Sequence, residues 1–367
     1  MTEPCTHHRL DGLEPDNLLA FLALLGLLRA LETARPDWRP RAAWDIENPP
    51  LRPFLVIAKA VNQREICSAA VAALSTLFVM IDFGTSNDLK MEKGEATKIL
   101  CRAAARQSAC AGGFFADFCA ALVSDGVLDQ EQKRVEPTPF AYPSVATSNF
   151  LRNAIAITKA ELPEKRGRDR SYPSDTAECL AQALFMPWQR RDRPVGLRWD
   201  PDEAKRHAHQ WRAPTKDPPT TQHGANRLAI AGLSAVLAVP MIVHNRPQLS
   251  VIGGEDGGDR FSFAWPIWRS PASLAAVRAL LSHPELRTPQ ALEYLGVDHV
   301  RVTRRISLDR LRNFTVAEPR SGCLQEGRLG GALLRELPHR DAELARLVDE
   351  VGGDAGAGES DALAGSG

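Results

Sequence analysis

The stretch LDGLEPDNLLAFLALLGLLRALE, residues 10–32, decides how the rest of the chain is interpreted. Its centre, residues 17–28, carries no charged side chain and is dominated by leucine. A helix that spans a bilayer needs roughly 20 apolar residues, and a signal peptide needs a basic start. This run is shorter than a span and follows Asp11, Glu14 and Asp16, so we predict a helix buried inside a large domain, with no membrane segment.

Two features inside this stretch predict how the helix begins and what packs on it. Asp16 and Asn17 follow Pro15, and either side chain is of the kind that accepts a hydrogen bond from a free N–H at a helix start. Gly26 interrupts the leucines and costs a helix roughly 1 kcal/mol relative to alanine. We expect Gly26 to allow another element to approach closely.

Composition limits the classes of function. The 367 residues contain 45 Lys and Arg against 45 Asp and Glu, so the whole molecule is not a generic binder of polyanions. The seven cysteines show neither disulfide spacing nor a C-x-x-C pair. These features are typical of a reducing compartment. We therefore expect a cytoplasmic protein without a bound metal or cofactor.

The hydrophobic pattern mixes helices and strands without a regular βαβ rhythm, which favours an irregular α+β fold of helices and short strands. A short strand is expected over 6–10, and an irregular connection over 38–53. Further strands are expected at 78–83, 240–245, 248–254, 260–268, 298–307 and 313–318. Helices are expected over 64–77, 94–107, 112–126, 224–240, 270–284 and 288–297.

We predict two lobes and a tail. Prolines and aromatics recur from residue 136 to 143, which places a boundary near 145. The N-terminal lobe, 1–145, is expected to be mainly helical, and the second lobe, 146–340, to be α+β and basic. Residues 341–367 are acidic and rich in Gly and Ala, and we expect disorder after 352.

One short motif is similar to part of an ATPase. In VMIDFGTSND, residues 79–88, an Asp follows an apolar run, and the turn after it offers backbone N–H groups to phosphate. The IDFGTS loop resembles the first phosphate loop of the actin and heat-shock-70 superfamily. About 75 residues precede it here, however, and no second phosphate loop is evident. The alternative is a strand that ends in a turn, with Asp82 or Ser86 bonding locally.

Other arrangements that carry chemistry have weaker support. His207, His209 and His223 invite a metal site, but no Cys or carboxylate completes a ligand set around them. No G-x-S-x-G elbow is present for a serine nucleophile. Asp45 and Glu47 are spaced to share a strand face, which is too common a pattern to indicate a hydrolase. We predict that the protein is not an enzyme.

Arginine is concentrated in the second half of the chain. Basic clusters occur at 164–170, at 188–199 and at 298–312, and five of the seven tryptophans lie in the same half. Arginine binds phosphate with paired hydrogen bonds, and exposed aromatics stack on bases. These features fit a nucleic-acid-binding surface. They fit equally well a solvated arginine-rich surface over a core that contains the tryptophans.

A family resemblance favours the first alternative. The order HHRLDGLEPDNLLAFLALLGLLRALE, followed by Trp38 and by WD at 44–45, resembles the N-terminus of CRISPR-associated proteins of subtype I-G, formerly I-U. Later segments that are also similar are HGANRLAIAGLSAVLAVP, FAWPIWRSPASLAAVRALL and GVDHVRVTRRISLDRLRNFTVAE. The matching residues of the opening are Leu10, Gly12, Pro15, Asn17 and Gly26.

The resemblance implies a large-subunit-like, non-catalytic component of a Cascade-like surveillance complex in antiviral defence. Its partners would be CRISPR RNA, target DNA and the other subunits of the complex. A structural or regulatory interaction protein remains the alternative from a different class. No motif-reading residue transfers from the family, so charge alone selects the candidate nucleic-acid contacts. These are Arg301, Arg304, Arg305, Arg310, Arg312, Lys165, Arg166, Arg168, Arg170, Arg190 and Arg191.

Overall fold

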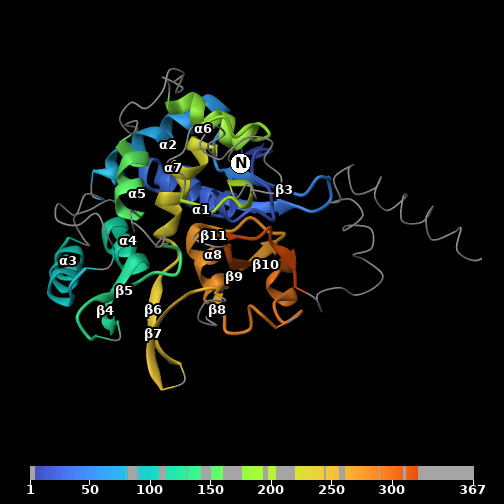
Figure 1. The fold of residues 1–367 in the computed structure, drawn as a ribbon. Helices are drawn as coiled ribbons and strands as arrows, with labels where there is room; N and C mark the ends of the chain where they lie inside the picture. Colours follow the sequence, from blue (N-terminus) through green and yellow to red (C-terminus); the bar gives the residue numbers. More distant parts are fainter. Residues whose placement is uncertain are drawn as a thin grey trace, which may run out of the picture.

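Helix α1 (Leu18–Ala34) forms the centre of the fold in the computed structural model, where it is buried from Leu18 to Leu31 (Figure 1). Asn17 caps the helix, because its Oδ1 accepts hydrogen bonds from the backbone N–H groups of Leu19 at 2.9 Å and Ala20 at 3.4 Å. The predicted buried helix and its cap are confirmed. The structure describes residues 5–79, 81, 89, 91–106, 113–129, 131–141, 150–159, 176–192, 197–203, 220–243, 245–255, 261–288, 290–308 and 311–320.

Helix α7 (His223–Leu233) packs against α1 so closely that the two backbones touch. A Cβ atom added at Gly26 would lie 1.8 Å from the carbonyl oxygen of Leu228, and one added at Gly232 would lie 1.9 Å from that of Leu22. No side chain fits at either position. The close approach predicted at Gly26 is therefore confirmed, and α7 is the element that makes it.

Residues near the start of the chain form a three-stranded antiparallel sheet, with the strand order β1-β3-β2. The expected strand at 6–10 is present, but the prediction of an irregular connection over 38–53 is wrong. Its prolines obscure two paired strands. The second strand opens at Arg52, buries alternate residues and places Pro53 opposite Trp44. The elements are β1 (Thr6–Arg9), η1 (Pro36–Trp38), β2 (Arg41–Asp45) and β3 (Arg52–Ile57).

The helices expected at 64–77 and 94–107 are confirmed, but the helix expected at 112–126 ends at Leu122. From Val123 onward the chain pairs with β5 instead, so tertiary pairing overrides the helical pattern. The strand expected at 78–83 is wrong at its start, since Phe78 still belongs to α2. The elements are α2 (Gln63–Phe78), α3 (Lys93–Ala105), α4 (Phe114–Leu122), β4 (Val123–Leu128), β5 (Val135–Pro137), α5 (Phe150–Lys159), α6 (Thr176–Phe185) and η3 (Pro201–Glu203).

The second sheet has the order β11-β10-β9-β8, and β12 also pairs with β10. Every residue of β9 is buried, and Trp265 of β9 stacks on Phe21 of α1 with 5.2 Å between ring centroids. This sheet therefore packs against the central helix. Its elements and their neighbours are β8 (Gly254–Glu255), β9 (Ser262–Trp268), α8 (Leu274–Leu281), η6 (Glu293–Leu295), β10 (Val297–Leu308), β11 (Leu311–Phe314) and β12 (Glu318–Pro319).

Three helices expected in this half are shorter than predicted. The helix expected over 224–240 ends at Leu233, and Pro240 lies within a strand. A two-stranded hairpin tolerates proline because no further strand needs its N–H. The segment 288–297 forms only the short turn η6, which ends where Gly296 adopts a φ of 79°. The helix expected at 270–284 is present as α8 but is also shorter, since it begins after its cap Ser273 and ends at Leu281.

The hairpin of β6 (Ala238–Val243) and β7 (Arg246–Val251) projects from the body of the molecule (Figure 1). Its outer part exposes apolar side chains: Val239 is 45%, Met241 51% and Ile242 78% exposed. A two-stranded hairpin has little core of its own, so these side chains lie on a surface that a partner has room to cover.

The fold class is α+β, as expected. One hydrophobic cluster contains residues from α1, α2, α7 and β9, and so it draws on both sides of residue 145. The division into lobes near 145 stays a prediction. The acidic tail, 341–367, lies outside the described residues. In the described part of the chain, no helix is both long enough and apolar enough to cross a bilayer.

Candidate functional site

Strand register builds a polar site on one face of the second sheet. Glu255 of β8 lies opposite Ser262 of β9, and Ser262 lies opposite Arg304 of β10. Directly opposed residues in a sheet place their side chains on the same face. Val302, two residues before Arg304, shares that face and lies opposite Glu318 of β12. Four strands therefore present one continuous surface here.

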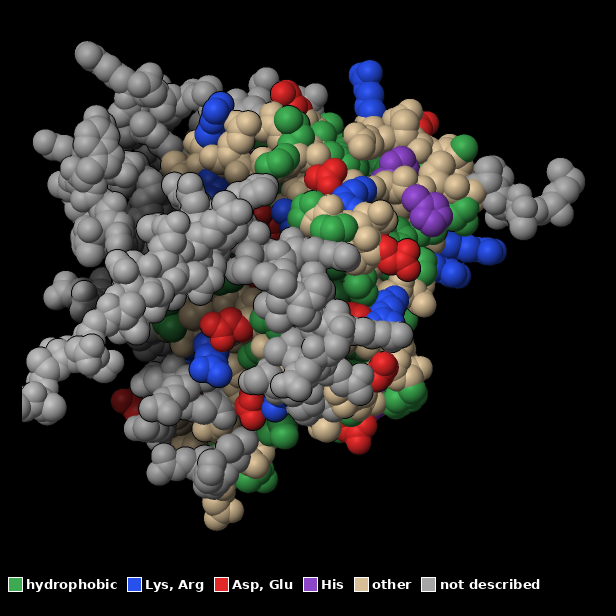
Figure 2. All heavy atoms as spheres, turned by 90° about the vertical axis from the view of Figure 1, so that its right-hand side faces the viewer, with side chains coloured by type: hydrophobic (Ala, Val, Ile, Leu, Met, Phe, Trp, Pro, Cys, Tyr) green, Lys and Arg blue, Asp and Glu red, His purple; other side chains and the backbone are tan. Residues whose placement is uncertain are grey.

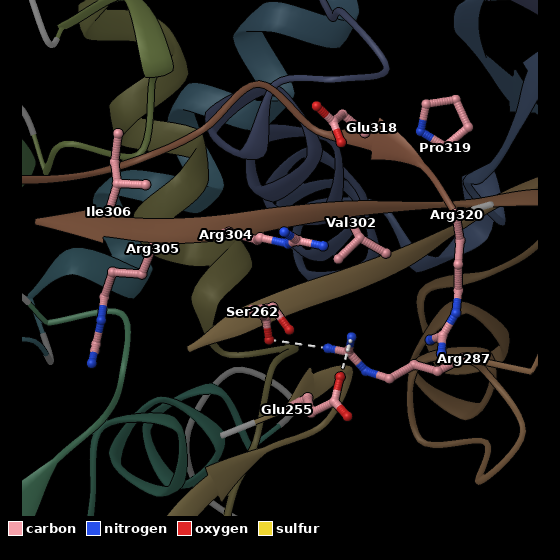
Figure 3. A pocket seen from close by; sticks show the side chains of 10 residues that line it. All are labelled: Glu255, Ser262, Arg287, Val302, Arg304, Arg305, Ile306, Glu318, Pro319 and Arg320. Carbon is pink, nitrogen blue, oxygen red and sulfur yellow. Dashed lines mark hydrogen bonds and ion pairs between the residues drawn. The ribbon is translucent and has the colours of Figure 1, made fainter. Parts of the chain in front are cut away.

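This surface is hollowed into a pocket of about 630 Å³ (Figure 3). Four arginines and two glutamates line it, so the lining has an excess of positive charge. The lining residues are Glu255, Ser262, Arg287, Val302, Arg304, Arg305, Ile306, Glu318, Pro319 and Arg320. We call this the arginine pocket.

Arg287 is the anchored cation of the arginine pocket. Its Nη2 donates to the carbonyl oxygens of Gly253 at 2.8 Å and Ser262 at 3.0 Å, and its Nη1 lies 3.0 Å from Oε2 of Glu255. Burial lowers the pKa of Arg287, the charge of Glu255 opposes that effect, and the neighbouring Arg320 adds to it. The remaining positive charge of the pocket therefore surrounds a guanidinium that is already fixed in place.

Arg304 and Arg320 supply the accessible charge. Arg304 is exposed on β10, and Arg320 is half-buried with its backbone N–H bonded to the carbonyl oxygen of Val300 at 2.9 Å. Arg320 extends toward Arg287 (Figure 3). Among the residues that the structure describes, no carboxylate forms an ion pair with either side chain. Both guanidinium groups thus retain donors for an external anion.

Arg305 closes one end of the arginine pocket. Its guanidinium lies over the ring of Phe261, 5.7 Å from the centroid, and its Nη1 donates to the carbonyl oxygen of Pro139 at 3.4 Å. Packing on an aromatic ring holds an arginine without neutralising it. Arg305 therefore occupies a restricted position in the pocket.

The predicted contacts on β10 divide between the two sides of the strand. Arg304 and Arg305 both line the pocket. Arg301 is only 4% exposed, so the surface of β10 presents Arg304 to solvent in its place. Arg312 lies on β11 opposite Ser307, and only its backbone is described.

Arg190 belongs to an internal ion-pair network. Its Nε lies 2.8 Å from Oδ2 of Asp200, and its Nη2 lies 2.9 Å from Oδ2 of Asp202. Burial alone lowers the pKa of Arg190, but the hydrogen bond and charge of Asp200 outweigh it, so the pKa lies above its usual value. Asp200 also accepts a hydrogen bond from Asn17 at 3.0 Å. The charge of Arg190 therefore stabilises the start of α1.

Arg191 lies apart from this network, exposed beside a second hollow of about 180 Å³. The other predicted basic residues lie outside the described residues. They are Lys165, Arg166, Arg168, Arg170 and Arg310.

Sequence reasoning missed Arg287 and Arg320. Each stands alone in a proline-containing segment, HPELRTP and AEPRS, so neither forms part of a basic cluster. Their positions depend on tertiary structure. The pairing of β12 with β10 brings Arg320 to the sheet, and the return of the chain after α8 brings Arg287 to it.

Most of the described tryptophans in the second half of the chain are buried, and Trp211 lies outside the described residues. Trp199, Trp265 and Trp268 are at most 2% exposed and belong to the core. Trp188 is half-buried, and its Nε1 donates to the carbonyl oxygen of Ala183 at 2.8 Å. Trp199, Trp265 and Trp268 therefore match the alternative of a core that contains the tryptophans, whereas Trp188 stays partly exposed.

Charge is mixed on one face of the molecule. On the face shown in Figure 2, the described basic side chains are interspersed with acidic and hydrophobic ones. Equal totals of acidic and basic residues predict such a surface. The arginine pocket is therefore a local concentration of charge on a neutral molecule.

The alternative chemistries of the sequence fall largely outside the described residues. Asp82 and Ser86 of the ATPase-like loop lie outside the described residues, and so do His207 and His209. His223 is buried at the start of α7, where burial and the charge of Arg227 lower its pKa to about 4. Within the described ranges, no group of three or more His, Cys, Asp or Glu side chains is arranged to hold a metal ion.

Comparison with known proteins adds no relative: no protein-family model, curated protein or solved structure matches the chain. A pocket lined by guanidinium groups, which offer only hydrogen-bond donors and positive charge, binds anions rather than transferring protons. Planar guanidinium groups favour phosphate and carboxylate oxygens in particular.

Proposed function

We propose that this chain is a non-catalytic, large-subunit-like component of a CRISPR type I surveillance complex, and that its arginine pocket holds phosphate groups of guide RNA or target DNA. One observation carries the proposal: Arg304 and Arg320 face the pocket without a carboxylate ion-pair partner among the described residues. Arginine neutralises backbone phosphates without reading sequence, which suits a subunit that positions a guided strand.

The projecting hairpin supports the multi-subunit part of the proposal. Val239 and Met241 lie two residues apart on β6 and share one face of the hairpin, and Ile242 is exposed on the other face. Exposed apolar patches of this kind mark contacts with other proteins. We propose that β6 and β7 pack against a neighbouring subunit, and that the complex works in the cytoplasm. The resemblance of residues 10–32 to subtype I-G proteins is the support for naming this complex.

A salt series tests the proposal directly. Labelled duplex DNA, single-stranded DNA and guide-like RNA are titrated with the unsubstituted protein and with the double variant Arg304→Gln, Arg320→Gln. If these side chains contact two phosphates, the variant binds roughly tenfold more weakly at low salt. The slope of log K against log salt then falls by roughly 2 for duplex DNA.

The matched control removes the same charge elsewhere. Arg64 of α2 and Arg152 of α5 are exposed, and the variant Arg64→Gln, Arg152→Gln has the same net charge as the pocket variant. We expect its binding and its salt slope to stay close to those of the unsubstituted protein. If both variants lose affinity equally, total charge and not the pocket determines binding. If none of the proteins binds nucleic acid, the proposal is overturned.

A further inference from the structure

The arginine pocket includes Arg320, the last described residue, and an acidic segment follows after 20 further residues of the chain. Glu318, Pro319 and Arg320 line the pocket, and the chain continues from Arg320 to residue 367. Residues 341–367 contain seven acidic residues and a single basic one, Arg346. The acidic residues are Asp341, Glu343, Asp349, Glu350, Asp354, Glu359 and Asp361.

The charges of the pocket and the segment are complementary. Arg304 and Arg320 keep free guanidinium donors, and a carboxylate accepts the same paired hydrogen bonds from arginine as a phosphate does. Glu255 already forms such an ion pair with Arg287 on one wall of the pocket. After Arg346 the segment has five acidic residues and no basic one, so its last part carries the strongest negative charge.

Chain length allows the contact. The connection between Arg320 and Asp341 comprises residues 321–340, which span at most about 70 Å when fully extended. The pocket includes Arg320 itself, so the connection only has to return to its own starting point. A tethered ligand of this kind acts at an effective concentration of about a millimolar, which offsets a weak intrinsic affinity.

We propose that the acidic segment 341–367 occupies the arginine pocket and competes there with nucleic acid. The competition rests on the proposed function, whereas the docking of the segment rests only on the pocket and its charge. A bound polyanion displaces the segment, so the chain discriminates against weak, non-specific polyanions. Only a nucleic acid that gains further contacts in the complex holds the pocket open.

The docking is tested with the full-length chain. In a neutral-tail variant, each Asp of 341–367 becomes Asn and each Glu becomes Gln. A fluorescent peptide of residues 341–367 is then titrated into this variant, and its anisotropy is followed. We expect saturable binding that weakens at least tenfold when Arg304→Gln and Arg320→Gln are added. The control pair Arg64→Gln, Arg152→Gln leaves it within twofold.

The competition is tested with the nucleic-acid probes. The neutral-tail variant is expected to bind single-stranded DNA roughly tenfold more tightly than the unsubstituted chain at low salt, and the free peptide should reverse that gain. Peptide binding that is absent, or equal in the pocket and control variants, overturns the docking. If no variant binds nucleic acid, the proposed function fails, and the peptide titration still decides whether the segment docks.

Discussion

Where α1 crosses α7, one added carbon atom has no room, whereas the arginine pocket leaves about 630 Å³ open above β10. The crossing is made by backbone atoms that approach each other, and it is closed to substitution. The pocket is made by side chains that project from a finished sheet, so its residues can change without altering the fold. The difference predicts which substitutions affect stability and which affect binding.

The largest effect is expected at the helix crossing. Gly26→Ala raises helix propensity by roughly 1 kcal/mol, but its Cβ meets the carbonyl oxygen of Leu228. Because backbone cannot give way as a side chain does, we expect a net loss of about 3 kcal/mol or more in the free energy of unfolding. Urea denaturation measures it. At Gly94 of α3, where an added Cβ has no neighbour within 4 Å, alanine should be neutral or stabilising.

Two adjacent arginines give the next comparison. Arg190→Gln leaves the fully buried Asp200 without its cation, and breaking a buried pair costs about 3 kcal/mol. Arg191→Gln alters an exposed side chain and should change stability by no more than about 0.5 kcal/mol. Thermal unfolding of both variants measures the contrast. Equal stabilities would contradict the assignment of Arg190 to the core of the fold.

A pH dependence of similar or smaller size is expected from Glu203. Burial, with a contribution from Asp200, raises its pKa from 4.5 to about 7, against the lowering effects of the Thr221 hydrogen bond and of Arg198. Between these two pH values the native state keeps a proton that the unfolded chain releases. Glu203 therefore makes stability fall as pH rises from about 4.5 to 7, by on the order of 3 kcal/mol.

The variant Glu203→Gln isolates this contribution, because its amide stays neutral throughout. Unfolding free energies at several pH values between 4.5 and 7 should fall less steeply for the variant than for the unsubstituted protein. If both proteins show the same slope, other groups cause the pH dependence.

The smallest effect on stability is expected on the projecting hairpin. Ile242→Ser changes a side chain that is 78% exposed, so the free energy of unfolding should move by no more than about 0.5 kcal/mol. Leu249→Ser on the paired strand removes a buried side chain and should cost roughly 2 kcal/mol or more. Unfolding curves compare the two. A large loss of unfolding free energy for Ile242→Ser would mean that Ile242 packs against the rest of the same molecule.

The features that the sequence predicts well are local ones. The helix at α1, its cap at Asn17 and the close approach at Gly26 follow from residues within one segment. The strands β2 and β3 were missed because prolines near their ends dominate the local pattern, while the pairing that stabilises them joins separate segments. Tertiary pairing also ends α4 earlier than its helical pattern predicts.

The arginine pocket could be predicted only in part. A run of arginines marks β10 as basic, and strand alternation separates Arg304 from the buried Arg301. Arg287 and Arg320 come from other segments, and their place in the pocket depends on strand pairing and on the return of the chain after α8. Arg190 is the opposite case. Its basic neighbours in the sequence predict a contact with nucleic acid, but its side chain pairs with Asp200, ten residues further on.

The glycine crossing also has a consequence for synthesis on the ribosome. Gly232 lies more than two hundred residues after Gly26, so α7 does not yet exist when α1 leaves the exit tunnel. At 5–20 residues per second, the leucines of α1 wait roughly 10–40 s for the helix that covers them. During that interval the nascent chain carries an unshielded apolar helix. The cell must therefore keep it from aggregating, and chaperones that hold emerging chains are suited to that task.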